Sequence, residues 1–142
     1  MWSDTLFHSE QLHLLRLLLW AGLSIVAGTA VGGFVTLRRI RSPFLRHFAI
    51  HMVTWGVVIG AIAAVEWSRV QMRDVSGAAR LERVLWLNLG LDAGYVAIGA
   101  VLALSAWMLA RRLAGVGAGI GIAIHGLALL AIDLQFAAVA SR

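Results

Sequence analysis

The chain has 142 residues, of which 61% are hydrophobic, and a formal net charge of +5 at neutral pH. Its mean hydropathy of +0.86 lies well above that of soluble domains, which indicates an integral membrane protein. The absence of cysteine excludes disulfides, thiolate metal sites and covalent c-type haem attachment. The basic residues are divided among several connections and form no continuous face, so we expect no nucleic-acid partner.

Four apolar segments are long enough to cross a hydrocarbon core about 30 Å thick, which needs roughly 20 residues per helix. They cover residues 12–37, 45–67, 84–109 and 116–138. The predicted fold is therefore all-α and integral to the membrane, with four transmembrane helices in an up-down bundle and residues 1–142 forming one domain. Because little chain remains outside the helices and no nucleophile with a positioned base is evident, we expect no enzymatic activity.

The connections predict an orientation in the membrane. The first, "RRIRSPFLR", and the third, "ARRLAG", contain arginines without acidic residues, whereas the second, about residues 68–83, has mixed charge. The positive-inside rule then places the first and third connections in the cytoplasm and both termini in the periplasm. All twelve basic residues are arginine, as is typical of GC-rich bacterial genomes, so we expect a bacterial inner membrane. In the second connection, "SGAARLERV" predicts a short helix capped by Ser76.

Polar residues gather in the half of each segment that lies nearer the second connection. Counting about 1.5 Å of rise per residue along each helix places one group of these polar residues at similar depths in the membrane. This predicted polar cluster consists of Arg16, Glu66, Asn88, Asp92, Tyr95 and Asp133. A charge in the bilayer costs at least about 2.5 kcal/mol, so such groups usually face the protein interior and have a partner.

Two interpretations of the polar cluster follow from its composition. In the first, the cluster is a structural clasp that fixes the helix register, with Arg16 paired to Asp92 or Asp133, or with one carboxyl kept protonated. In the second, Asp92 and Asp133 belong to a path for protons or a small cation. In the third segment, Asn88, Asp92 and Tyr95 follow one helical stripe, which predicts that this helix is the hub of the bundle or meets another subunit.

Glycines with GxxxG spacing occur in every segment and predict close helix packing or a homo-oligomer. The pairs are Gly28 and Gly32, Gly56 and Gly60, Gly90 and Gly94, and Gly117 and Gly121.

Two histidines, His51 and His125, lie at similar depth on different helices. Such a pair could hold a b-type haem axially or bind a metal ion. A single histidine on a helix is, however, more often a hydrogen-bonded core residue, so we expect no cofactor and keep haem as the alternative. His8 and His13 lie near the N-terminal boundary and suggest no special role.

Three strings carry a resemblance to a known family: "HMVTWG", "LNLGLDAGY" and "HGLALLAIDL". The chain resembles a family of small, uncharacterised four-helix bacterial membrane proteins, a domain of unknown function, over about residues 47–135. The family pattern is N-x-x-L-D-x-x-Y in the third helix and G-x-x-L-x-x-x-D in the fourth. It maps to Asn88, Leu91, Asp92, Tyr95, Gly126, Leu129 and Asp133. The resemblance implies the four-helix architecture and supplies no activity, cofactor or substrate.

The function that these features favour is that of a non-enzymatic accessory or assembly subunit of a membrane complex, or of a self-associating bundle held by a polar clasp. Its expected partners are the lipid bilayer and further copies of the chain or other membrane subunits. The alternative is a proton or small-cation transporter or channel component that uses Asp92 and Asp133. A second alternative is a b-type haem-binding electron carrier.

Overall fold

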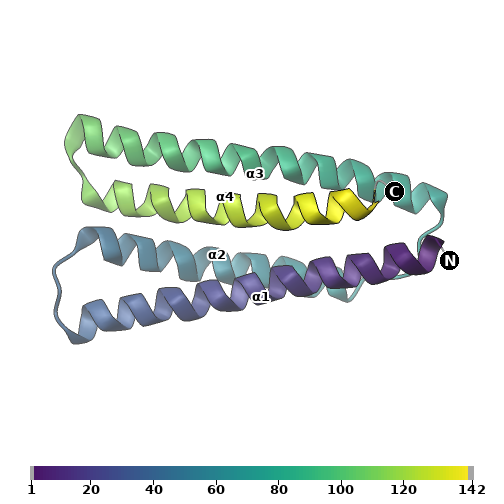
Figure 1. Cartoon of the computed structure of the whole chain (residues 1–142). Coiled ribbons are helices and arrows are strands. Elements are labelled where there is room, and N and C mark those ends of the chain that lie inside the picture. Colours follow the sequence, from purple (N-terminus) through teal and green to yellow (C-terminus); the bar gives the residue numbers. More distant parts are fainter. Residues whose placement is uncertain (1, 141–142) are drawn as a thin grey trace.

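The protein is an up-down arrangement of four long helices, seen in a computed structural model that describes residues 2–140 (Figure 1). The helices are α1 (Trp2–Leu37), α2 (Pro43–Trp67), α3 (Val75–Ala110) and α4 (Leu113–Ala140), and the described residues contain no strand. All four are long and apolar enough to cross a membrane. The predicted all-α class is therefore confirmed, although α1 and α3 begin roughly ten residues earlier than hydropathy alone indicated.

Side-chain caps explain where α2 and α3 begin. The Ser42 hydroxyl accepts a hydrogen bond of 3.3 Å from the Leu45 N–H, and proline occupies the first turn of α2, where no N–H is needed. At α3, the Asp74 carboxylate accepts from the Gly77 N–H at 2.7 Å. The prediction of a separate short helix capped by Ser76 is wrong: residues 76–84 belong to the first turns of α3, which Asp74 caps, and the Ser76 hydroxyl donates to Asp74.

Short connections place sequential helices antiparallel. Residues 38–42 and 111–112 form the first and third connections at one end of the molecule, and the second connection lies at the other end with both termini (Figure 1). Arg39 and Arg111 adopt left-handed backbone conformations, with φ of 52° and 46°, and so turn the chain sharply after α1 and α3.

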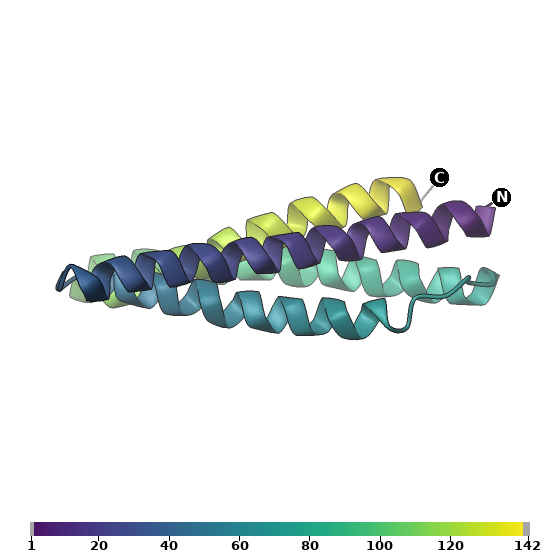
Figure 2. The ribbon, with the colours of Figure 1, turned by 90° about the horizontal axis from the view of Figure 1, so that it is seen from below.

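The central helix of the bundle is α4. It packs against α3 on one side and against α1 and α2 on the other, while α1 and α2 also pack on each other (Figures 1 and 2). Within the described residues, the backbone of α3 approaches no helix except α4. The expectation that the third helix is the hub is therefore wrong, because the glycine-rich helix that permits close approach on several faces is α4.

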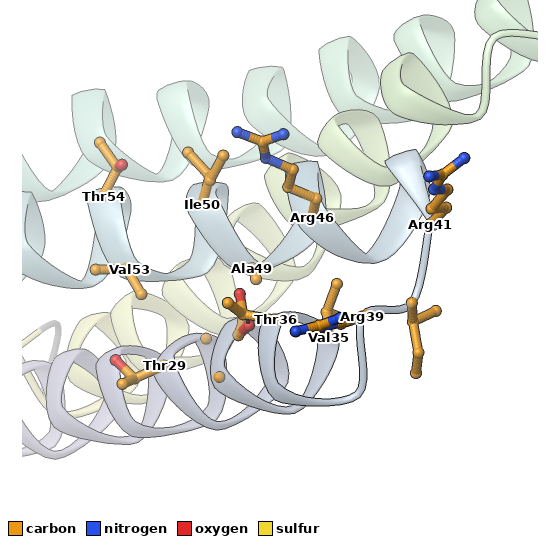
Figure 3. Close-up of a pocket in the computed structure, with 14 residues that line it drawn as sticks. Thr29, Val35, Thr36, Arg39, Arg41, Arg46, Ala49, Ile50, Val53 and Thr54 are labelled. Atoms are coloured by element: carbon orange, nitrogen blue, oxygen red, sulfur yellow. Dashed lines mark hydrogen bonds between the residues drawn. The ribbon is translucent and has the colours of Figure 1, made fainter.

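Glycine creates the closest helix contacts. Between α1 and α2, a Cβ at Gly28 would lie 2.9 Å from the Ala49 carbonyl oxygen, and one at Gly56 would lie 3.0 Å from that of Ala21. From Gly28 towards the first connection the contact loosens, since a Cβ at Gly33 would meet no atom within 4 Å. The two helices leave a groove there (Figure 3).

The remaining predicted glycines divide into two kinds. Gly117 and Gly121 of α4 lie tightly against α2, and Gly32 and Gly60 make ordinary contacts with alanine side chains of the facing helix. Gly90 and Gly94 of α3, in contrast, meet nothing within 4 Å.

The α3–α4 contact relies on glycines outside the predicted pairs: Gly99, Gly119 and Gly126, at each of which a Cβ would lie under 3.0 Å from backbone of the facing helix.

The outer surface of the bundle marks the two boundaries of a membrane. The helices α1 and α3 each contain 36 residues, about 54 Å of helix, which exceeds a hydrocarbon core of about 30 Å. Exposed Arg16 of α1 and Arg38, the residue that follows α1, are separated by about 33 Å of helix rise, and Arg46 and Glu66 of α2 by about 30 Å. Exposed charges therefore occur one membrane thickness apart on both helices, with apolar surface between them.

Candidate functional site

The buried polar centre of the bundle joins three helices. His13 of α1, Asp92 of α3 and Asp133 of α4 are each less than one-tenth exposed. The His13 Nε2 lies 3.6 Å from Asp133 Oδ1, and the imidazole stacks on Phe136 with 4.5 Å between ring centroids. The carboxylates of Asp92 and Asp133 are close enough to interact electrostatically. We call His13, Asp92 and Asp133 the polar triad.

The polar triad is not fully hydrogen-bonded within the protein. His13 Nδ1 and Asp92 Oδ2 are buried and have no partner among the described residues. An unpartnered buried polar atom costs about 1–3 kcal/mol, and two neighbouring carboxylates repel if both are ionised. The triad is therefore suited to keeping a proton on one carboxyl or to meeting a small polar ligand.

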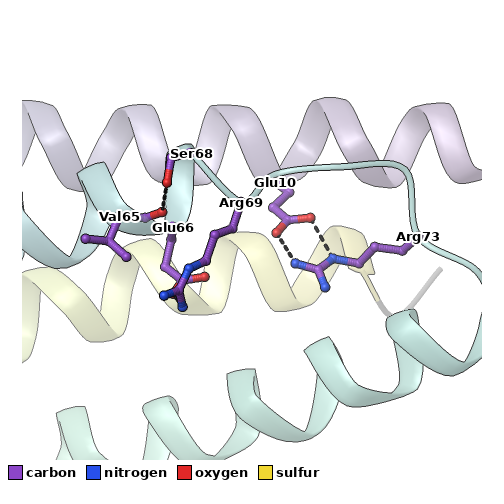
Figure 4. Close-up of polar contacts among 6 residues, drawn as sticks. All are labelled: Glu10, Val65, Glu66, Ser68, Arg69 and Arg73. Carbon is purple, nitrogen blue, oxygen red and sulfur yellow. Dashed lines mark hydrogen bonds and ion pairs between the residues drawn. The ribbon is translucent and has the colours of Figure 1, made fainter.

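A second interhelical tie lies at the end of the bundle that contains the second connection. Arg73, just before α3, donates from Nε to one carboxylate oxygen of Glu10 at 2.9 Å and from its terminal nitrogen to the other (Figure 4). Glu10 is only 5% exposed. Donating these hydrogen bonds to the Glu10 carboxylate raises the pKa of Arg73 above its ordinary value. This bidentate pair fastens the second connection to α1.

Two members of the predicted polar cluster lie elsewhere. Arg16 is exposed on the outside of α1 and pairs with neither Asp92 nor Asp133 within the described chain. Glu66 is also exposed and forms an ion pair of 3.6 Å with Arg69, one turn further on (Figure 4). The expected pairing of Arg16 with an aspartate is therefore wrong. Because Arg16 and Glu66 lie at a membrane boundary, they can reach water and need no interior partner.

The stripe expected on the third helix is divided by the structure. Asp92 faces the interior and Asn88 is exposed on the outer surface of α3. Tyr95 is half-buried and lies edge-on against Trp55 of α2, with 5.3 Å between ring centroids. Tyr95 thus bridges α3 to α2 through side chains where the two backbones do not approach.

The histidines on α2 and α4 come together as the sequence predicted. The rings of His51 and His125 lie 6.2 Å apart at an interplanar angle of 76°, and Trp20 meets His125 edge-on at 5.7 Å. The Nδ1 of His125 hydrogen-bonds the carbonyl of Gly121 at 3.0 Å, which assigns the proton to Nδ1 and leaves Nε2 as an acceptor. The Nε2 atoms of both rings are buried without a partner among the described residues.

The surroundings of these imidazoles bear on haem binding. A Cβ at Gly121 would lie 3.1–3.3 Å from three atoms of His51, so the backbone of α4 passes directly against that ring. A porphyrin ligated by both histidines would have to enter this close α2–α4 contact. The described residues also contain no group of three or more potential metal ligands.

Sequence reasoning missed His13, Glu10 and Arg73. His13 was given no role, yet it is the imidazole of the polar triad, and Glu10 forms the buried ion pair. A signal was present, because Glu10, His13, Ser24 and Gly28 recur at helical spacing and share the buried side of α1. The partner of Glu10 could not be found this way, since Arg73 is far away in the sequence.

Comparison with known proteins gives a family and no activity. No curated protein and no solved structure matches the chain. Residues 16–134 match the model of a family of unknown function, DUF6992. The matched region begins within α1 and ends next to Asp133 in α4, and so includes Asp92, Asp133 and all four helices in whole or in part. The chain, a bundle of four helices long and apolar enough to cross a membrane, therefore belongs to the DUF6992 family.

Proposed function

We propose that the protein is a non-enzymatic subunit of the bacterial cytoplasmic membrane that self-associates through the outer face of α3. The observation that carries this proposal is the open glycine surface of α3, where Gly90 and Gly94 meet nothing within the bundle. Around them lie the exposed side chains of Leu87, Leu91 and Ile98. These five residues recur at helical spacing, and we call them the α3 outer face.

The α3 outer face fits a helix of a second copy better than lipid. Lipid gains little from glycine, whereas two helices approach closely where glycine removes the side chain, and this packing drives association in membranes. The exposed amide of Asn88 lies one turn before Leu91 and can hydrogen-bond across such a contact. The polar triad and the Glu10–Arg73 pair act in this proposal as the clasp that makes each copy a rigid unit.

The test compares glycines in matched surroundings. Gly90→Leu combined with Gly94→Leu should convert an oligomer into a monomer in mild detergent, measured by light scattering of the purified protein. Gly22→Leu is the control, because Gly22 on α1 also meets nothing within 4 Å and lies outside the α3 outer face. A protein that is monomeric before substitution, or that dissociates equally with Gly22→Leu, contradicts the proposal.

The polar triad supports a second candidate, a proton or small-cation path. Its specific support is the unpartnered Oδ2 of Asp92 beside the carboxyl of Asp133 in the bundle interior. Carboxyls buried between apolar helices of a membrane protein commonly take part in proton relays. Proteoliposome flux that is lost in Asp92→Asn and Asp133→Asn, but kept in Glu66→Gln, is the expected result for this candidate. Flux unchanged in both aspartate variants eliminates it.

The proposed orientation places the first and third connections in the cytoplasm and the termini in the periplasm. It rests on dense arginines without acidic residues in those two connections. Because the chain contains no cysteine, single cysteines report on one position each. In intact cells, a membrane-impermeant maleimide should label Ser3→Cys and spare Ser42→Cys. The reverse pattern overturns the orientation.

A further inference from the structure

The groove between α1 and α2 faces the first connection and has a volume of about 880 Å³, within the range of ligand sites. Its inner end lies where the helices touch at Gly28, and its wide end is lined by Arg39, Arg41 and Arg46 (Figure 3). We call it the α1–α2 groove. It lies on different helices from the α3 outer face and is independent of the proposed association.

Within residues 2–140, the arginines at the wide end have no counterion. All seven acidic residues of the chain lie elsewhere, none of them in the first connection or in the groove lining. Among the described residues, neither Arg39 nor Arg41 nor Arg46 forms an ion pair. A guanidinium group without an acidic neighbour attracts a phosphate group, which it binds through paired N–H donors.

The inner part of the groove combines apolar side chains, threonines and glycines. Ile50 and Val53 of α2 lie on one wall, and on the opposite wall Gly32 and Gly33 open space between the side chains of α1. A chain of methylene groups can lie along this surface. The same groove therefore offers an apolar trough that leads into the membrane and a cationic rim at the membrane boundary (Figure 3).

We infer that the α1–α2 groove binds an anionic phospholipid, with the phosphate held by Arg39, Arg41 and Arg46 and one acyl chain along Gly32 and Gly33. Charge complementarity favours this occupant. Basic groups at the membrane surface attract anionic lipids more strongly than zwitterionic lipids, which have no net charge. An apolar helix of another protein would leave the arginine rim without an anion.

The test measures lipid retention by native mass spectrometry of the full chain in detergent, with phosphatidylglycerol and phosphatidylcholine as probes. The unaltered protein should retain phosphatidylglycerol about tenfold more strongly, and Arg39→Gln combined with Arg46→Gln should remove most of that preference. Equal retention of the two lipids by the unaltered protein overturns the inference.

Arg111→Gln combined with Arg112→Gln is a matched control. It removes the same charge at the same end of the bundle. Arg111 shares the left-handed backbone conformation of Arg39. Its guanidinium lies 5.6 Å from the Trp107 ring, and it does not line the groove. We expect it to change phosphatidylglycerol retention less than about twofold. A loss as large as that of the groove variant shows a non-specific charge effect and contradicts the inference.

A third variant examines the apolar part of the site. Gly33→Leu places a side chain in open groove space, where a Cβ meets no atom within 4 Å, so the fold tolerates it. It should lower phosphatidylglycerol retention severalfold while the arginines are intact. Unchanged retention in Gly33→Leu, or displacement of the lipid by inorganic phosphate at equal concentration, shows that the acyl chain is not held in the groove and overturns the lipid assignment.

Discussion

The Nε2 of His13 and the Oδ1 of Asp133 lie 3.6 Å apart in the interior of the bundle and connect the first helix to the last. The imidazole of His13 thereby gives one of the two buried carboxyls a polar neighbour on another helix. The second carboxylate, Asp92, comes from α3, so this one contact brings together the helix pairs α1–α2 and α3–α4. The relationship gives the polar clasp a testable structural role.

Removing the imidazole should destabilise the bundle, whereas removing one carboxylate should not. His13→Leu leaves the buried carboxyl of Asp133 without the imidazole that lies 3.6 Å from it, and we expect a loss of about 1–2 kcal/mol. Asp92→Asn removes the repulsion between the carboxylates and should leave stability equal or slightly higher. Thermal unfolding in detergent measures both. A larger loss in Asp92→Asn than in His13→Leu contradicts the assignment of His13 as the stabilising partner.

The Glu10–Arg73 pair should contribute more than the exposed pair nearby. Arg73→Gln leaves the buried Glu10 carboxylate without its bidentate partner, at a cost of about 2 kcal/mol. Arg69→Gln breaks the ion pair with Glu66, at a cost below about 0.5 kcal/mol, because the side chains of Arg69 and Glu66 are 70% and 47% exposed. Denaturation midpoints of the two variants in one detergent give the comparison, and equal midpoints rule out a special contribution of Arg73.

Adding one methyl group should have opposite effects on two glycines. At Gly126 a Cβ would lie 2.7 Å from the Val96 backbone nitrogen, so Gly126→Ala should separate α3 from α4 and cost about 1–3 kcal/mol. Gly22 meets nothing, so Gly22→Ala should stabilise α1 by up to about 1 kcal/mol through helix propensity. Thermal unfolding of both proteins tests the sign. If Gly126→Ala is neutral, the close α3–α4 contact is not tight in solution.

The cap of α3 should depend on pH. The backbone N–H of Gly77 and then the Ser76 hydroxyl hold the pKa of Asp74 below its ordinary value of 3.8. A lowered folded-state pKa stabilises the cap above the unfolded pKa, and this contribution disappears as pH falls through the folded pKa. The amide proton of Gly77, followed by NMR, should titrate with a midpoint below 3.8, and this titration should vanish in Asp74→Asn. A midpoint above 3.8 contradicts the cap.

The purified protein should show no haem absorption. The backbone of α4 at Gly121 lies against His51, so a porphyrin ligated by His51 and His125 would have to separate α2 from α4. An absorption spectrum of protein prepared from haem-supplied cells measures this directly. A Soret band that disappears in His125→Ala would establish the haem-binding alternative instead.

The sequence by itself determined the architecture. A run of about 20 apolar residues indicates a helix surrounded by lipid, and each of the four segments shows this independently of the others. It also brought His51 and His125 to one level, since depth is simple arithmetic along a helix. Depth does not give rotation about the helix axis. Arg16 and His13 are three residues apart, yet Arg16 faces outwards and His13 faces Asp133.

Only the tertiary structure decided which faces meet. Gly90 with Gly94 and Gly117 with Gly121 have the same spacing, yet the first pair is open and the second is packed against α2. The choice of α4 as the central helix and the pairing of Glu10 with Arg73 likewise depend on contacts between segments distant in the chain. Each rests on several helices packing at once, which a pattern along one helix does not encode.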